Sequence, residues 1–180
     1  IDKDKFTVVV WDPPGYGRSR PPERDYSGNY FQRDADYLVE LVKKVGIDKY
    51  SVLGWSQGGV TGVHLAATAP ENVKNLIIFG TFACVDEFVV SERPISRIET
   101  WSEEMKAPFV KVYGEEYLRR SWDGWAESIM RFYYEEGGDM GHQKLMGLVK
   151  CPTLIIHGDS DPIVPVGHAL HLQNHIKNSK

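Results

Sequence analysis

The chain of 180 residues has only two cysteines, and it has neither a long apolar run nor a basic run. Cys84 and Cys151 lie far apart beside apolar segments, which predicts reduced thiols rather than the disulfide scaffold of a secreted protein. No apolar run approaches the roughly 20 residues that cross a bilayer. The net charge of −4, with no basic stripe, argues against a nucleic-acid partner. We therefore expect an intracellular protein, cytoplasmic or mitochondrial, without a membrane span.

Motifs for metals and phosphate groups are also lacking. No Cys/His spacing resembles a zinc site, so no metal is predicted. Gly15 and Gly17 could suggest a phosphate-binding loop, but the third glycine of that motif is missing and prolines stand where its helix should begin. The segment from Asp12 to Pro22 is therefore interpreted as a rigid connector, and no cofactor is expected.

The most informative stretch that is present runs from Tyr50 to Gly59. Strand-forming residues lead into Gly54-Trp55-Ser56-Gln57-Gly58, and a helix-forming segment follows, from Val60 to Ala69. A Gly-x-Ser-x-Gly sequence between a strand and a helix is typical of a nucleophile elbow, in which the serine sits at a strained turn. Ser56 is therefore the predicted nucleophile.

The order of elements predicts an α/β fold with a mostly parallel sheet and helices on both of its faces. Strands are expected at Phe6 to Trp11, which reads as buried on both faces, at Tyr50 to Leu53, at Val73 to Gly80 and at Thr153 to His157. Amphipathic spacing predicts a helix from Asn29 to Val45. A last helix is expected from Val166 to Lys177.

The alternation of strands and helices is interrupted between residues 86 and 148. Three helices are expected there, at Pro94 to Ala107, Glu115 to Glu136 and Gly141 to Val149, and the segment is rich in tryptophan and tyrosine. Residues 1–180 are thus interpreted as one domain with a helical cap inserted at 86–148. Any single aromatic side chain there is best explained by packing, although as a group a few are expected to face a pocket that is partly apolar.

A nucleophilic serine needs a base, and the base needs an acid that orients it. Asp161 fits the acid because it lies in a proline-stiffened loop directly after the strand that ends at His157. Asp159 is the alternative, but it could cap the turn instead. The backbone N–H of Gln57 is the expected oxyanion donor, because it belongs to the residue after the nucleophile.

No histidine in the sequence is a convincing base. His168, His171 and His175 follow Asp161, but they share one face of the closing helix, whereas a catalytic histidine needs a loop after one more strand. His64 is expected to be a packed or surface residue. The chain also starts without Met, so we expect a fragment. The first strands of the fold, its last strand and helix, the base and the second oxyanion donor are expected to lie outside it.

These motifs resemble the α/β-hydrolase superfamily over essentially the whole chain. The matching sequences are Asp12-x-x-Gly15-x-Gly17-x-Ser19, Gly54-Trp55-Ser56-Gln57-Gly58-Gly59 and His157-Gly158-Asp159-Ser160-Asp161-Pro162. Within it, Gly-Trp-Ser-x-Gly-Gly, Trp101-Ser102-Glu103 and Tyr113-Gly114 are similar to the biphenyl hydrolase-like enzymes, which cleave α-amino acid esters.

The resemblance implies a serine esterase that acts through an acyl-enzyme on a small-molecule ester, with Ser56 and Asp161 catalytic and with Trp55 and Gln57 near the substrate. The chain departs from it at Gln57, where the resembled esterase has an aspartate that binds the substrate's ammonium group. Two alternatives stay open: a carbon–carbon bond hydrolase of the same fold, and a binding protein that has kept the fold without the chemistry.

Overall fold

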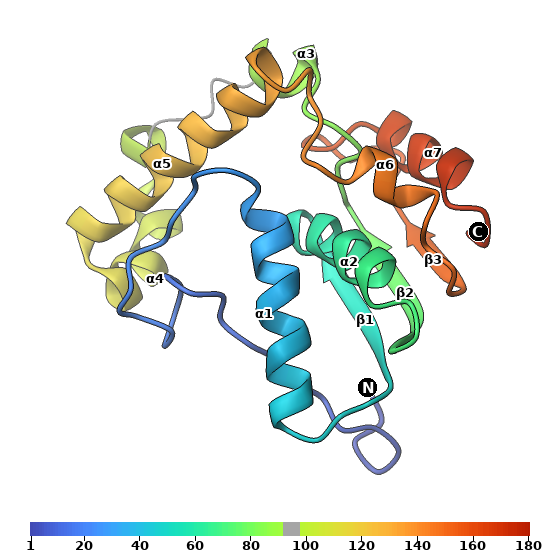
Figure 1. The fold of residues 1–180 in the computed structure, drawn as a ribbon. Helices are drawn as coiled ribbons and strands as arrows, with labels where there is room; N and C mark the ends of the chain where they lie inside the picture. The colour runs from blue at the N-terminus through green and yellow to red at the C-terminus, as the bar shows by residue number, and fades with distance from the viewer. Residues whose placement is uncertain (92–97) are drawn as a thin grey trace.

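A parallel sheet of three strands forms the centre of the computed structural model, which describes residues 1–91 and 98–180 (Figure 1). The strands are β1 (Tyr50–Trp55), β2 (Val73–Phe79) and β3 (Thr153–Ile156), in the order β1-β2-β3. Trp55 pairs with Phe79, and Phe79 with Ile156, so the strands end side by side. Because carboxyl ends of parallel strands meet at one edge, the loops after all three strands emerge together.

Helices cover one face of this sheet. They are α1 (Tyr30–Lys44), α2 (Gln57–Thr68), α6 (Gln143–Met146) and α7 (Val166–His175). Asn29 begins α1 as predicted, because its side-chain oxygen accepts a hydrogen bond from the Gln32 N–H at 3.1 Å. The hydrophobic core between the sheet and these helices contains side chains from both. Among them are Ala35, Val63, Leu76, Ile78, Met146 and Leu172.

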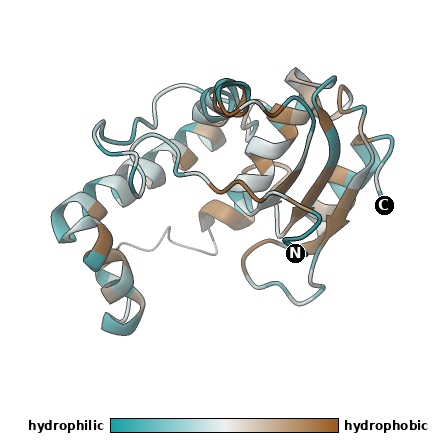
Figure 2. Cartoon of the chain, turned by 90° about the horizontal axis from the view of Figure 1, so that it is seen from below, coloured by the Kyte–Doolittle hydropathy of each residue, from teal (hydrophilic) through white to brown (hydrophobic). Residues whose placement is uncertain are grey.

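The strands are largely hydrophobic along their length, as their colour in Figure 2 shows, and several of their apolar side chains on the other face of the sheet are exposed. Leu53 is 58% exposed, Trp55 69% and Ile156 49%. The prediction of helices on both faces is therefore not matched on this side by the residues that the structure describes. No helix in residues 1–91 and 98–180 is long and apolar enough to span a membrane.

Between β2 and β3 the described chain is helical. It forms α3 (Glu87–Ser91), a short 3₁₀ turn η1 (Ile98–Thr100), α4 (Glu103–Tyr113), α5 (Glu115–Tyr134) and α6. The predicted helices at 115–136 and 141–149 are confirmed with shorter bounds. The one predicted at 94–107 begins outside the described residues, and its remainder is divided between η1 and α4.

A second core cluster joins α5 to the helices on the sheet. Ile129 and Phe132 of α5 are buried against Tyr30 and Phe31 of α1 and Val60 of α2. The ring centroids of Phe31 and Phe132 lie 6.0 Å apart. The helical segment is thus packed onto the rest of the molecule through its longest helix, while its role as a cap stays a prediction.

The expected buried strand from Phe6 to Trp11 is wrong. The segment has no strand pairing, and Phe6 is 62% exposed and Val10 88%. β-branched residues favour strands because they pack well on a paired, half-buried sheet surface, and not because their backbone prefers the strand conformation by itself. Neither a pairing strand nor a covering layer meets this segment in the described structure, so its apolar pattern does not produce a strand.

Residues that follow α7 return to the sheet. The N–H of Ile155 donates to the Lys180 carbonyl at 2.9 Å, and Thr153 and Ser179 form a parallel bridge. No strand pairing was predicted after the closing helix. Residues 178–180 therefore run alongside β3 and point toward the edge where the three strand-end loops emerge.

Candidate active site

Ser56 occupies a strained turn between β1 and α2. It has φ 52° and ψ −123°, and it is the one residue other than glycine with positive φ in the described chain. Gly54 makes the turn possible, because a Cβ there would overlap the backbone of Gly58 and Gly59. The predicted elbow geometry is confirmed, and it leaves the Ser56 hydroxyl half-buried at the start of a helix of 12 residues.

The neighbours of Ser56 differ in their surroundings. Gln57 is the first residue of α2, so its backbone N–H lies in the turn whose amides have no partner within the helix. Trp55 stacks on Phe79 with ring centroids 6.4 Å apart and is 69% exposed. A donor amide and an exposed indole thus flank the serine.

Asp161 lies in the loop after β3, at the same edge of the sheet. Its Oδ1 accepts hydrogen bonds from the backbone N–H groups of Ile163 at 2.8 Å and Val164 at 3.0 Å. Its Oδ2 lies 3.7 Å from the point where a Cβ on Gly80, just past β2, would stand. Asp159 is exposed, and its carboxylate accepts only the Ser160 hydroxyl among its described partners. The turn-capping role considered for Asp159 is thus performed by Asp161.

Three histidines are held by hydrogen bonds away from Ser56. His64 is fully buried, with Nδ1 2.9 Å from Gln32 Oε1 and Nε2 3.2 Å from the Met140 carbonyl, so the expectation of a packed residue is confirmed. His142 Nε2 contacts the Phe82 carbonyl at 3.2 Å, and burial lowers its pKa to about 4. His157 Nε2 lies 2.7 Å from the Val164 carbonyl.

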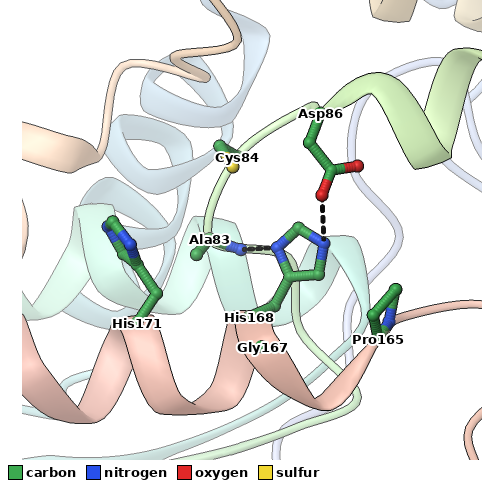
Figure 3. Close-up of a pocket in the computed structure, with 7 residues that line it drawn as sticks. All are labelled: Ala83, Cys84, Asp86, Pro165, Gly167, His168 and His171. Carbon is green, nitrogen blue, oxygen red and sulfur yellow. Dashed lines mark hydrogen bonds and ion pairs between the residues drawn. The ribbon is translucent and has the colours of Figure 1, made fainter.

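His168 and His171 of α7 line a separate pocket of about 220 Å³ with Cys84 and Asp86 (Figure 3). The Ala83 N–H donates to His168 Nδ1 at 3.2 Å, so the proton of the neutral ring is on Nε2, 3.4 Å from Asp86 Oδ2. Burial lowers the pKa of His168 and raises that of Cys84. His168 Nδ1 already accepts the Ala83 N–H, and the raised pKa of Cys84 favours its protonated thiol, so this group is not an activated nucleophile.

His171 and His175 complete the set. Their rings stack with centroids 4.1 Å apart, which confirms that they share a helix face. In the part of the chain that the structure describes, no histidine is hydrogen-bonded to Ser56, and no group of three or more His, Cys, Asp or Glu side chains is arranged to hold a metal.

The connector before α1 is tied to the helical segment by side-chain contacts that the sequence did not predict. Tyr113 of α4 accepts a hydrogen bond from the Gly17 N–H at 3.1 Å. The Arg20 guanidinium lies 4.7 Å from the ring centroids of both Tyr113 and Tyr117. The predicted rigid connector therefore has partners about 100 residues away, and spacing along the chain gave no signal for them.

The sequence profile of the α/β hydrolase fold matches residues 1–106. That is more than half of the chain, and the strained serine turn lies inside it. The chain belongs to the α/β-hydrolase family. Among solved structures, this α/β hydrolase is similar to NosK from Streptomyces actuosus, with a TM-score of 0.75 and 21% identity, over 99% of this chain and 75% of that one.

Curated relatives are more similar in sequence. The α/β hydrolase is 40% identical to serine hydrolase BPHL of Homo sapiens over 181 aligned positions, and 41% identical to that of Mus musculus over 182. In both cases the match covers 100% of this chain and 62% of the relative. The α/β hydrolase thus spans a little under two thirds of the length of these relatives.

Proposed function

We propose that this α/β hydrolase is a serine hydrolase that cleaves carboxylic esters through an acyl-enzyme, with Ser56 as nucleophile. The observation that carries the proposal is the backbone of Ser56, at φ 52° and ψ −123° between β1 and α2. Strain of this kind costs roughly 1–3 kcal/mol and persists where the surrounding structure over-determines it, often at active sites. The similarity to serine hydrolase BPHL supports the same reaction class.

In the proposed reaction Ser56 Oγ attacks the ester carbonyl while its proton passes to a base. The negative charge that develops on the carbonyl oxygen is stabilised by the backbone N–H of Gln57 at the positive end of α2. Collapse breaks the ester bond, and the alcohol leaves with the proton from the base. Water then hydrolyses the acyl-enzyme and restores the serine hydroxyl.

Asp161 is the proposed acid that orients the base. The two N–H donors on Oδ1 fix the carboxylate against rotation. Oδ2 is turned toward the end of β2 and lies at the edge to which Ser56 also belongs. A fixed carboxylate at this edge is what an imidazole beside Ser56 would need for its orientation.

We propose that the base is a histidine outside residues 1–180. The six histidines of these residues are occupied or located elsewhere, as described above. Residues 178–180 run parallel to β3 and point toward the edge that holds Asp161. A base at this edge would lie beside both Ser56 and Asp161, where it could accept the serine proton.

Gln57 and Trp55 are the proposed substrate contacts. The Gln57 side chain carries no charge, so it can accept a hydrogen bond from a substrate amine but cannot pair with an ammonium group. Trp55 offers an exposed aromatic surface beside the serine. We therefore propose esters with an apolar acyl or alcohol part, without a strong preference for a cationic α-amino group.

The test is labelling with a fluorophosphonate probe in the native protein that carries these residues, followed by mass spectrometry of the labelled peptide. Labelling of Ser56 that is lost in Ser56→Ala, and retained in the control Ser51→Ala on the exposed side of β1, would support the proposal. Absence of labelling in a folded protein would contradict it and favour a binding protein of the same fold. Labelling without hydrolysis of any aryl or alkyl ester would contradict the ester substrate.

A further inference from the structure

The turn that follows β2, Phe79-Gly80-Thr81, contacts both halves of the candidate site. We propose that Gly80 and Thr81 are positioning residues, which hold the serine turn and the acid loop in the geometry of the proposed reaction. This inference rests on the proposed function. None of the three residues is assigned contact with the reacting atoms, so their effect would pass through Ser56, Gln57 and Asp161.

Backbone hydrogen bonds from this turn reach the strands on both sides. The Phe79 carbonyl accepts the Ser56 N–H at 3.0 Å, at the point where β1 becomes the strained turn. The next residue, Gly80, donates its N–H to the Ile156 carbonyl at 3.2 Å, at the end of β3. Two consecutive residues thus connect the serine turn to the strand that leads into the acid loop.

Gly80 leaves room for two side chains of the site. Its φ is +54°, a conformation that side-chain-bearing residues rarely adopt. A Cβ on Gly80 would stand 3.4 Å from Trp55 Nε1 and 3.7 Å from Asp161 Oδ2. The indole of β1 and the carboxylate of the β3 loop therefore converge on this glycine, and any shift of its backbone would move the point at which they meet.

Thr81 fixes the first turn of α2. It is 2% exposed, and its side chain fills the space that a Cβ on Gly59 would occupy. Its hydroxyl donates to the Phe79 carbonyl at 3.3 Å, the same oxygen that accepts the Ser56 N–H. Gly59 in turn donates its N–H to the Ser56 carbonyl at 3.0 Å. The threonine is thus in contact with the helical turn that directs the Gln57 N–H.

Such contacts matter for rate because reacting groups tolerate little displacement. A misplacement of about 1 Å can cost roughly 100-fold in rate even when its origin is remote from the reacting atoms. Ground-state binding of the substrate is less sensitive to the direction of one amide. Variants of the turn are therefore expected to lower kcat more than they raise KM.

Thr81→Val is the first test, made in the native protein that carries these residues. Valine replaces the hydroxyl by a larger methyl group against Gly59 and removes the donor to Phe79, so kcat is expected to fall about tenfold or more with KM little changed. Thr81→Ser keeps the hydroxyl and should retain activity within about twofold. The matched control is Thr153→Val, because Thr153 is also buried and its hydroxyl also donates to the carbonyl two residues earlier, that of Cys151 at 3.2 Å.

Gly80→Ala is the second test, with Gly147→Ala as its control. Gly147 has φ −68° and an open environment, so a Cβ there meets nothing within 4 Å. We expect Gly80→Ala to lower kcat by about tenfold or more and Gly147→Ala to leave it unchanged. Equal kcat losses in Thr81→Val and Thr153→Val, or no loss in Gly80→Ala, would overturn the positioning role.

A measurement that needs no activity separates this inference from the proposed function. Hydrogen exchange of the Ser56 amide should accelerate in Thr81→Val and not in Thr153→Val, because only the former loosens the acceptor of that amide. Unchanged exchange at Ser56 overturns the inference even in an active hydrolase. A wild-type protein that cleaves no ester contradicts the function, and the exchange result then still decides whether the turn holds Ser56.

Discussion

Arg24 and Asp34 form a buried ion pair with two parallel hydrogen bonds, Nη1 to Oδ1 at 2.8 Å and Nη2 to Oδ2 at 2.7 Å. Their side chains are 4% and 7% exposed. Although burial alone would lower it, the pKa of Arg24 is raised by its hydrogen bond and charge pairing with Asp34. Tyr16 and Tyr30 pack their rings around the guanidinium at 4.9 and 5.2 Å. The pair joins the segment that follows the connector to α1.

Removing one partner should destabilise the protein strongly. Asp34→Ala leaves the Arg24 charge buried without compensation, and breaking such a pair costs about 3–5 kcal/mol. The control is Glu116→Ala, because the Glu116 side chain is 88% exposed in its pair with Arg120 and exposed pairs contribute below about 1 kcal/mol. Urea unfolding gives both free energies. Similar losses in the two variants would show that the Arg24–Asp34 pair is not effectively buried.

The hydroxyl of Tyr117 should contribute to the attachment of the connector. It accepts the Arg24 N–H at 3.0 Å and donates to the Gly15 carbonyl at 2.5 Å. Tyr117→Phe leaves both partners unsatisfied in a half-buried place, so we expect a loss of about 1–3 kcal/mol in the free energy of unfolding. Tyr134→Phe, at a 71% exposed tyrosine of the same helix, should change it by a few tenths at most. Equal losses in the free energy of unfolding would show that the Tyr117 hydroxyl does not stabilise the attachment of the connector.

The parts of this fold that sequence predicts are those whose cause is local. Ser56 is strained because of its own turn and the glycines around it, so the motif was sufficient to predict the geometry that the structure has. The helix after Asn29 was predicted for the same reason, since its cap and its apolar stripe lie in one short segment.

Contacts between distant segments were not predictable. Thr81 has no motif of its own, and its importance appears only where Gly59 meets it across the sheet edge. Phe6 to Trp11 shows the converse error, because an apolar run specifies a strand only when a partner and a packed layer meet it. Strand pairing and side-chain packing depend on the assembled fold, and they cannot be read directly from a single sequence.

Stability should fall in mild acid because of His142. Burial first, and the neighbouring His64 second, lower the pKa of His142 to about 4, against about 6.5 in an unfolded chain. The unfolded state therefore binds the proton first. The contribution of the neutral ring to the free energy of unfolding is complete above about pH 6.5, decreases as the pH falls toward 4 and is lost below it. A pKa shift of this size corresponds to roughly 3 kcal/mol in that free energy.

The measurement is urea unfolding at pH 7, 5.5 and 4.5 for the wild type and His142→Gln. Glutamine can still donate to the Phe82 carbonyl but does not titrate, so the wild type should lose more stability than the variant between pH 7 and 4.5. His175→Gln, at an exposed histidine, should retain the wild-type dependence. Parallel curves for wild type and His142→Gln would exclude His142 as the titrating group.

Charge at position 57 should control the preference for amino acid esters if the proposed function holds. Gln57→Asp places a carboxylate at the first residue of α2, where a negative charge suits the helix dipole, so the variant should fold. An ammonium group about 4 Å from that carboxylate gains on the order of 1–4 kcal/mol, depending on exposure. We expect the ratio of kcat/KM for an α-amino acid ester to that for its deaminated analogue to rise about tenfold or more.

The control is Gln57→Asn, because asparagine matches aspartate in shape without the charge and should leave the ratio near its wild-type value. The gain should shrink at high salt, because exposed charges are screened. An equal ratio in Gln57→Asp and Gln57→Asn would show that the side chain after Ser56 does not face the substrate, and it would leave Trp55 as the proposed contact.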